Sequence, residues 1–229
     1  MRIAELFASI QGEGILAGVP SVFVRTSGCN LRCVWCDTPY TSWEPEGAEM
    51  STDDLLDRIV STARRIRHAV ITGGEPMLTE AIVELTQKIR ELGMHITIET
   101  AGTIYRPVAC DLMSISPKLA NSTPHEREAG RWASRHEERR FQPDVLRRLM
   151  AEYEYQLKFV VVDANDLPEI RAIIKTLGAT PDRVLLMPEG RTAAVMHERG
   201  ALVAELCKQE GFRYSPRLHV DLWGDRRGV

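Results

Sequence analysis

Short apolar segments that alternate with longer amphipathic segments constrain the fold of this chain more than any other feature. The apolar segments, which are typical of buried strands, cover residues 21–25, 69–72, 95–99, 112–115, 157–162 and 184–187. The amphipathic segments predict helices over residues 51–67, 80–92, 166–177 and 191–209. A strand followed by a helix, repeated about six times, produces right-handed βαβ units and a parallel sheet. The sequence therefore predicts an α/β protein, and periodicity alone leaves open whether the strands form a doubly wound sheet or a partial barrel.

Two segments depart from this alternation. Residues 1–20 predict a short strand, a glycine-rich turn at Gln11-Gly12-Glu13-Gly14 and a return. Residues 119–142 are polar and charged, so we expect a solvated excursion on the surface. No linker rich in glycine and serine interrupts the 229 residues, a length that fits one domain. We therefore expect a single domain over residues 1–229, with a hairpin at 1–20 and a charged insertion at 119–142.

Composition excludes several classes of protein. The 29 Lys and Arg residues against 32 Asp and Glu give a net charge of −3, which does not favour a general nucleic-acid binder. No apolar run approaches the ~18 residues that a membrane span needs. The N-terminal residues lack the apolar stretch and cleavage site of a signal peptide, so we expect a cytoplasmic protein. The chain has five cysteines, an odd number that cannot all pair, and the cytoplasm is reducing. A disulfide framework is therefore not expected.

Three cysteines follow the first core strand with the spacing C-x3-C-x2-C, at Cys29, Cys33 and Cys36. Ligands of parallel sheets gather at the carboxyl ends of the strands. Structural zinc sites and ordinary ferredoxin clusters both take four protein ligands. Cys110 and Cys207 stand alone, and we expect them to be buried small apolar residues. Three close cysteines without a fourth favour a 4Fe–4S cubane with one open iron, and a zinc site completed by a distant histidine is the alternative.

Further polar residues follow the later strands. The turn Thr72-Gly73-Gly74-Glu75-Pro76 combines glycines that allow close approach of a ligand with a carboxylate that can accept an ammonium group. Alone, this turn is equally typical of a strand-to-helix connection. Other polar groups near the strand ends are Glu99, Ser116, Lys118, Gln156 and Lys158. Singly, each is typical of a cap, a surface lysine or, for Glu99, a buried ion pair with Lys158.

The cysteine spacing and the later GGEP turn together resemble the motifs of the radical S-adenosylmethionine (SAM) superfamily. Local sequences resemble one family in it, the 7-carboxy-7-deazaguanine synthases, over nearly the whole chain. The matching segments are residues 7–14, 23–25, 36–38, 72–76, 116–118 and 218–224. Residues 119–142 match no motif of the family. The resemblance implies a partial (β/α)6 barrel of the radical SAM type with an N-terminal hairpin extension.

The resemblance also implies the cofactors and their sites. SAM would bind the open iron of the 4Fe–4S cluster through its amino and carboxylate groups. The positions that match the SAM site are Trp35, Asp37, Gly74, Glu75, Ser116, Pro117, Lys118, Gln156 and Lys158. Thr38 matches the position that contacts Mg²⁺, an ion that takes few protein ligands. A helix N-cap is the alternative role for Thr38.

The implied substrate is 6-carboxy-5,6,7,8-tetrahydropterin, bound by Gln11, Gly12, Glu13, Arg25 and Thr72. A carboxylate such as Glu13 can accept the two neighbouring N–H donors on the pterin edge. The guanidinium of Arg25 suits the substrate carboxylate, because the two groups pair through two hydrogen bonds. Strand alternation puts Arg25 on the face opposite the valines of residues 22–24, and so toward the ligand. A salt bridge at the rim of the sheet is the alternative for Arg25.

The resemblance implies a radical SAM lyase of the queuosine and 7-deazapurine pathway. The 5′-deoxyadenosyl radical would abstract a hydrogen atom from the pterin, and ring contraction and loss of ammonia would give 7-carboxy-7-deazaguanine. The cluster and SAM generate the radical, so no side chain is assigned a catalytic role. The expected partners are an external one-electron reductant, such as flavodoxin or ferredoxin, and a second copy of the chain. We also expect the C-terminal residues to close the pocket.

Two other functions remain open at this point. A glycyl-radical enzyme activase shares the cysteine spacing and a GGEP-like turn, although the Gln-Gly-Glu-Gly turn combined with Arg25 argues against it. A non-catalytic zinc-binding module on an α/β scaffold is the second.

Overall fold

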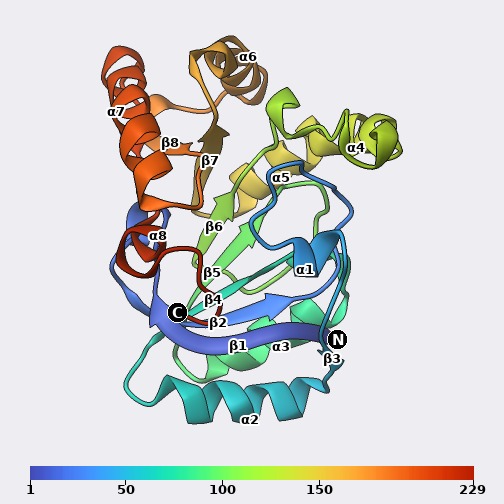
Figure 1. The fold of residues 1–229 in the computed structure, drawn as a ribbon. Coiled ribbons are helices and arrows are strands. Elements are labelled where there is room, and N and C mark those ends of the chain that lie inside the picture. Colours follow the sequence, from blue (N-terminus) through green and yellow to red (C-terminus); the bar gives the residue numbers. More distant parts are fainter.

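One mixed sheet of nine strands runs through the computed structural model, which describes residues 1–229 (Figure 1). Six parallel strands form its centre in chain order: β2 (Pro20–Thr26), β4 (His68–Gly73), β5 (His95–Thr100), β6 (Leu112–Ile115), β7 (Tyr155–Val161) and β8 (Val184–Pro188). All six strands predicted from the sequence are confirmed. A doubly wound sheet would reverse its strand order at a switch point, and this sheet does not. Its edge strands β3 (Ala48–Glu49) and β9 (Arg213–Tyr214) do not pair with each other, so the sheet is a partial, open barrel.

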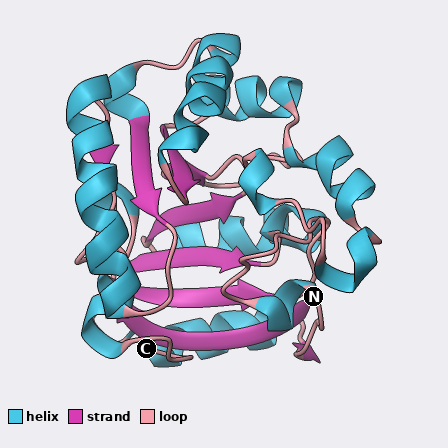
Figure 2. Cartoon of the chain, turned by 45° about the horizontal axis from the view of Figure 1, so that its top comes forward, coloured by secondary structure: helices cyan, strands magenta, loops and turns pink.

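Helices surround the outer side of this sheet (Figure 2). The longer ones are α2 (Thr52–Ala63), α3 (Ala81–Glu91), α5 (Pro143–Glu152), α6 (Leu167–Leu177) and α7 (Ala193–Glu210). In α3 the buried residues Ile82, Leu85, Thr86 and Ile89 recur at the spacing of one helix face, which explains why this segment folds as a helix against the sheet.

Two connections differ from the predicted alternation. α5 was not predicted, and residues 101–111 connect β5 to β6 without a helix. The first helix predicted from the sequence, α2, also ends earlier than predicted, at Ala63, because Arg64 leaves the helical conformation with a φ of 48°. No helix has both the length and the apolar character to cross a membrane. Because one sheet includes strands from both ends of the chain, we propose that residues 1–229 fold as one domain.

The N-terminal hairpin is confirmed, but its second strand is β2 itself and not a return within residues 1–20. β1 (Arg2–Ile10) pairs antiparallel with β2, so that Glu5 lies opposite Arg25 and Phe7 opposite Phe23. The valines of β2 are fully buried in the main core. Phe23 and Arg25 occupy the other face, as alternation predicts. The hairpin therefore extends the sheet and directs Arg25 away from the core.

Residues 119–142 are a surface excursion only on their outer side. They contain two short 3-10 turns and α4 (Ala133–Arg140). His136 is buried, and its Nδ1 accepts a hydrogen bond of 3.1 Å from the backbone N–H of Arg32. The carbonyl of the buried Ser122 accepts another, of 2.8 Å, from Val34 N–H. The prediction of a merely solvated segment is therefore wrong for its inner side, which fixes the loop after β2.

Candidate active site

A cavity with a volume of about 250 Å³ lies at the carboxyl ends of the parallel strands, where ligands of such sheets bind. Its wall combines the hairpin, the cysteine loop, several strand ends and the C-terminal segment. The residues predicted from the sequence that line it are Gln11, Gly12, Glu13, Arg25, Cys29, Cys33, Trp35, Cys36, Asp37, Thr38, Thr72, Gly74, Ser116, Lys118 and Lys158. Those that do not line it are Glu75, Pro117 and Gln156. One cavity thus brings together most residues that the sequence assigned separately to cluster, SAM and substrate.

The three cysteines of the motif lie on the loop between β2 and the short helix α1 (Pro39–Ser42), and all three line the cavity. Burial raises the pKa of the Cys29 thiol to about 12 and also raises that of Cys33. No three His, Cys, Asp or Glu side chains lie close enough together to hold a single metal ion. A cubane cluster takes one thiolate per iron, so its ligands surround it and do not meet at one point. Three thiols around one cavity therefore fit such a cluster.

The other two cysteines lie outside this wall, as predicted. Cys207 belongs to the main core, and Cys110 packs against that core with its thiol 3.7 Å from the carbonyl of Ile96. Neither residue lines the cavity. No fourth cysteine is therefore available to the cluster site.

Trp35 is held in the cavity wall by a neighbouring segment. Its indole N–H donates to the backbone carbonyl and the side-chain oxygen of Asn121, at 3.1 and 3.2 Å. The Asn121 amide in turn donates to the carbonyl of Val160 and to Asp166. The orientation of the indole is therefore fixed before any ligand binds.

Two glycines at the end of β4 are required by close packing, Gly73 against Thr26 of β2 and Gly74 against Gly28 at the start of the cysteine loop. Gly73 has a φ of +142°, and a Cβ on Gly74 would lie 2.2 Å from the carbonyl oxygen of Gly28. The next residue, Glu75, is buried and accepts hydrogen bonds from Thr100 Oγ1 at 2.8 Å and Ala101 N–H at 2.9 Å. Burial raises the pKa of Glu75. Its carboxylate is held by these bonds behind the cavity wall, and its contact with SAM stays a prediction.

Gln156 and Pro117 also act from behind the wall. The Gln156 side chain accepts from Ile15 N–H at 2.9 Å and donates to Ser114 Oγ at 2.7 Å. Both polar atoms of the Gln156 amide are thus hydrogen-bonded within the chain. The bond to Ile15 fixes the turn that carries Glu13. Pro117 is buried, while its neighbour Lys118 lines the cavity.

Lys118 and Ser116 form a pair at the end of β6. The Lys118 ammonium donates to the carbonyl and the hydroxyl of Ser116, at 2.8 and 2.9 Å. Both residues line the cavity. This part of the wall therefore presents a positive charge and a hydroxyl, which suits a carboxylate or a ribose.

A network of charges surrounds Glu13 and is exposed to solvent only at Asp37. Its carboxylate pairs with Lys158 and accepts a hydrogen bond of 3.0 Å from Arg217 Nε. Arg217 also pairs with Asp37 and donates to the carbonyl of Gly190. Burial opposes ionisation of Glu13, but the two cations outweigh it and lower its pKa below the usual value. Glu13 is therefore a charged acceptor at neutral pH.

Glu99 does not form the ion pair with Lys158 that the sequence left open. Its carboxylate accepts hydrogen bonds from Gln11 Nε2 at 3.1 Å and from Thr72 Oγ1 at 2.9 Å. All three side chains line the cavity. The predicted substrate residues Gln11 and Thr72 are thus oriented by one carboxylate.

Arg25 has both of the properties that the sequence offered as alternatives. Its Nε donates to Glu5 at 2.7 Å, which is the salt bridge at the rim of the sheet. The Nη1 and Nη2 atoms have no hydrogen-bond acceptor within the chain. Tyr40 O–H donates to the same carboxylate at 2.7 Å. Glu5 therefore holds Arg25 in place and leaves its two terminal nitrogens available to a ligand.

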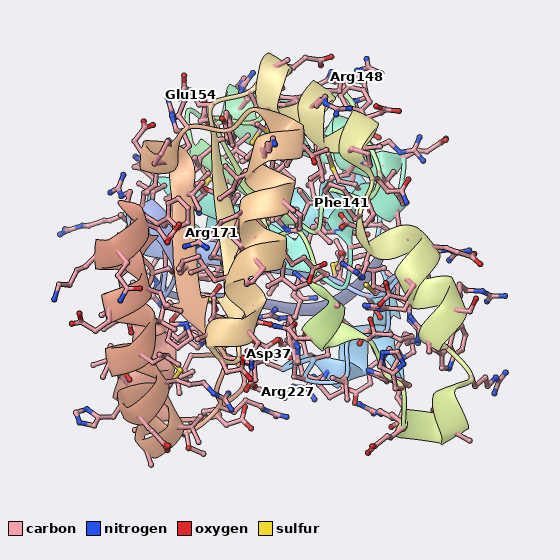
Figure 3. The ribbon with its side chains drawn as sticks, turned by 90° about the horizontal axis from the view of Figure 1, so that it is seen from above. Asp37, Phe141, Arg148, Glu154, Arg171 and Arg227 are labelled. Atoms are coloured by element: carbon pink, nitrogen blue, oxygen red, sulfur yellow. The ribbon has the colours of Figure 1, made fainter.

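The C-terminal segment forms part of the wall, as expected from the sequence. α8 (Leu218–Trp223) places His219 against Gly12, where a Cβ would lie 2.1 Å from the His219 Nδ1. The Arg227 guanidinium lies 3.6 Å from the centre of the Tyr40 ring. Figure 3 shows Asp37 and Arg227 on the same side of the molecule, in agreement with their shared place in the cavity wall. Segments far apart in the sequence thus close one pocket.

Sequence reasoning missed Glu5 and Arg217. Alternation in β1 puts Glu5 on the same face as Phe7, and this pattern could have indicated that Glu5 faces the site. Arg217 directly precedes the recognised tail motif, but nothing in the sequence shows which acids it pairs with.

Comparisons with known proteins agree with this geometry. Residues 23–121 match the model of the radical SAM superfamily. A 7-carboxy-7-deazaguanine synthase of Halobacterium salinarum is 49% identical over 98% of this chain and 91% of its own length. One of Rhodopirellula baltica is 43% identical over 100% of this chain and 89% of its own length. The chain belongs to the 7-carboxy-7-deazaguanine synthase family.

A structural comparison supports the same assignment. The crystal structure of QueE from Escherichia coli superposes with a TM-score of 0.70 at 27% identity, covering 95% of this chain and 94% of that one. The partial barrel with its N-terminal hairpin is therefore the fold of this family. Membership in the family decides against the activase and the zinc module that the sequence left open.

We predict that Arg217→Ala lowers the free energy of unfolding by about 2 kcal/mol, because the largely buried Glu13 loses a charged hydrogen-bond partner. Denaturant unfolding followed by circular dichroism measures this loss. Arg171→Ala is the control, because it removes an exposed pair with Glu210 that is worth about 1 kcal/mol or less. Equal losses in the two variants would contradict the role assigned to the network.

Proposed function

We propose that this cavity converts 6-carboxy-5,6,7,8-tetrahydropterin to 7-carboxy-7-deazaguanine, the radical SAM lyase reaction of the queuosine and 7-deazapurine pathway. The observation that carries the proposal is that the cysteine motif, Glu13 and Arg25 line a single cavity. The family to which the chain belongs supports the reaction, and the donor set of the wall supports the residues.

Cys29, Cys33 and Cys36 hold the 4Fe–4S cluster in this proposal. When bound, the cluster and SAM supply the one-electron chemistry that yields a 5′-deoxyadenosyl radical for hydrogen abstraction from the pterin. The protein places the reactants and excludes water. The C-terminal segment contributes to that exclusion, because it covers the hairpin side of the cavity.

The polar groups around the cysteine loop hold SAM. Lys118 and Ser116 present a cation and a hydroxyl, and Trp35 presents an indole already fixed by Asn121. Asp37 and Lys158 line the same wall but are paired with Arg217 and Glu13. Asp37 and Lys158 therefore contribute to SAM binding through the electric field of charges that are already fixed at the edge of the SAM site. Glu75, Pro117 and Gln156 support this wall from behind.

The pterin lies against Glu13, Gln11, Thr72 and Gly12. Glu13 remains ionised because two cations face it, and its oxygens can accept the neighbouring N–H groups of the pterin. Gln11 and Thr72 are oriented by Glu99, so these groups lose little freedom when substrate binds. Arg25 binds the substrate carboxylate through Nη1 and Nη2, while its Nε keeps the pair with Glu5.

Thr38 is proposed to bind Mg²⁺ together with water and substrate oxygens. It occupies the N-cap position of α1, but its side chain makes no capping hydrogen bond. Its hydroxyl lines the cavity and lies 3.3 Å from Thr41 Oγ1. The hydroxyl is therefore available to an ion, and a turnover rate independent of Mg²⁺ would contradict the assignment.

The remaining partners are an external one-electron reductant of the flavodoxin or ferredoxin type and a second copy of the chain. A homodimer is the commonest oligomer of soluble proteins. The molar mass in solution tests it directly, because a monomer has a mass of 25.8 kDa. Five free cysteines suit the reducing environment of the cytoplasm.

We predict that Cys33→Ala abolishes product formation and leaves a nearly colourless protein, because one of three cluster ligands is lost. Iron and sulfide analysis after anaerobic reconstitution, together with absorbance near ~400 nm, measures the cluster. Cys110→Ala is the matched control, since this thiol packs against the core away from the cavity, and it should retain both cluster and activity. Unchanged product from Cys33→Ala would disprove the proposed function.

We predict that Arg25→Ala weakens substrate binding by about 1.5–3 kcal/mol, the value of a charged hydrogen-bond partner. Binding of the carboxypterin to the anaerobic holoenzyme measures this loss, and SAM cleavage uncoupled from product should persist. Arg25→Lys, which can keep the pair with Glu5 but lacks the planar fork, should recover only part of the affinity. Normal affinity in Arg25→Ala would show that another residue binds the carboxylate.

A further inference from the structure

A group of arginines without acidic partners surrounds the outer side of the cysteine loop. This basic patch consists of Arg32, Arg127, Arg131, Arg135 and Arg139. None of the five has a carboxylate within salt-bridge distance, whereas Arg140 on the inner side of the same segment pairs with Glu137 and Glu169. The charges of the patch are therefore left to solvent or to another molecule.

The arrangement of the patch is ordered. Arg131, Arg135 and Arg139 are exposed; Arg135 and Arg139 lie one turn apart on one side of α4, and Arg131 lies just before the helix begins. The guanidinium of Arg32 lies 4.7 Å from the centre of the Trp132 ring, and those of Arg131 and Arg135 lie 5.4 Å from it. Like charges at this spacing destabilise a helix. The Trp132 ring attracts these cations and offsets part of the repulsion, but no carboxylate neutralises them, so the positive charge stays concentrated on this surface.

The patch adjoins the site of the cluster. Arg32 lies between two cluster cysteines and donates to the carbonyl of Cys29 at 2.8 Å. Arg139 donates to the carbonyl of Asn30 at 3.5 Å. Figure 1 shows α4 beside the loop that follows β2. Positive charge and the metal-binding loop therefore share one face of the protein.

An apolar side chain is exposed on the same loop. Val34, between Cys33 and Cys36, is 41% exposed. Its backbone is held by Ser122, from the segment that carries the patch. Protein interfaces combine apolar contacts with a polar rim, and arginine is enriched in them. This surface has that composition.

We propose that the basic patch is the docking surface for an acidic one-electron carrier protein that reduces the cluster. The inference rests on the proposed function. With a flavodoxin as the carrier, the flavin hydroquinone loses one electron and becomes the semiquinone, and the cluster gains that electron. Opposite charges speed such encounters and orient the partners, so that the carrier meets the loop where the cluster binds.

The observations favour an acidic protein over a nucleic acid as the partner. The chain has a net charge of −3, and Glu126, Glu128 and Glu138 are exposed in the same segment. A nucleic-acid site is usually a continuous basic surface on a basic domain. The patch is small and lies at the point where an electron must enter.

The test uses the anaerobic holoenzyme with reduced flavodoxin as the probe. Arg131→Glu/Arg135→Glu should slow reduction of the cluster by about tenfold at low ionic strength, as expected for loss of electrostatic steering. The difference should disappear near ~0.5 M salt, where the charges are screened. Cluster absorbance in stopped flow and the affinity for flavodoxin are two readouts. Product formation driven by dithionite, which needs no docking, should not change.

Arg65→Glu/Arg67→Glu is the matched control, because both arginines are exposed, lack acidic partners and precede β4 at the opposite end of the strands. This control variant changes the net charge by the same amount, and flavodoxin should reduce its cluster at the wild-type rate. Equal slowing in both variants, or in neither, would overturn the proposal, as would a patch variant that also fails with dithionite. Loss of tRNA binding with normal reduction would assign the patch to nucleic acid instead. If the wild type makes no product with dithionite, the proposed function fails, while cluster reduction still reports on docking.

Discussion

The ion pairs of the Glu13 carboxylate are the interaction on which the cavity depends. Glu13 comes from the turn after β1, Lys158 from β7 and Arg217 from the segment before α8. Arg217 extends the network to Asp37, next to the cluster cysteines. A buried charge without a partner is costly, so these segments are stable only when all of them are docked together. The same contacts fix the charge of Glu13 and the position of the cysteine loop.

The cysteine loop has little regular structure of its own and is held by its neighbours. Gly74 allows the turn after β4 to pass close to it, and His136 and Ser122 bond to its backbone from the other side. His136 is buried, which lowers its pKa to about 4, so it stays neutral and keeps its Nδ1 as an acceptor. Three thiols are therefore presented to one cavity by a loop that is fixed before the cluster is inserted. Such preorganisation reduces the entropy that must be lost when ligands bind.

The sequence predicted what depends on local pattern. The six apolar segments became the six parallel strands, and alternation along β2 correctly directed Arg25 away from the core. Cysteine spacing placed three thiols on one loop. The sequence could not show pairs formed by residues far apart in the chain. Arg217 and Glu13 are 204 residues apart, and no periodicity connects them.

The direction in which a polar side chain faces is harder to predict. Glu75 and Gln156 are polar residues at strand ends, and the sequence does not show whether such a group faces a ligand or the chain itself. Both side chains form hydrogen bonds with backbone and hydroxyl groups of the chain itself, because buried polar groups must be hydrogen-bonded. The charged segment 119–142 was misjudged for a related reason, since its few inward residues are hidden among many exposed charges. Composition averaged over a segment does not resolve its two sides.

A structure of the anaerobic protein with cluster, SAM and the carboxypterin tests the central claim most directly. We expect one iron on each sulfur of Cys29, Cys33 and Cys36, SAM on the fourth iron, and the substrate carboxylate on the terminal nitrogens of Arg25 with its Glu5 pair intact. A protein side chain on the fourth iron, or a substrate carboxylate bound away from Arg25, would contradict it.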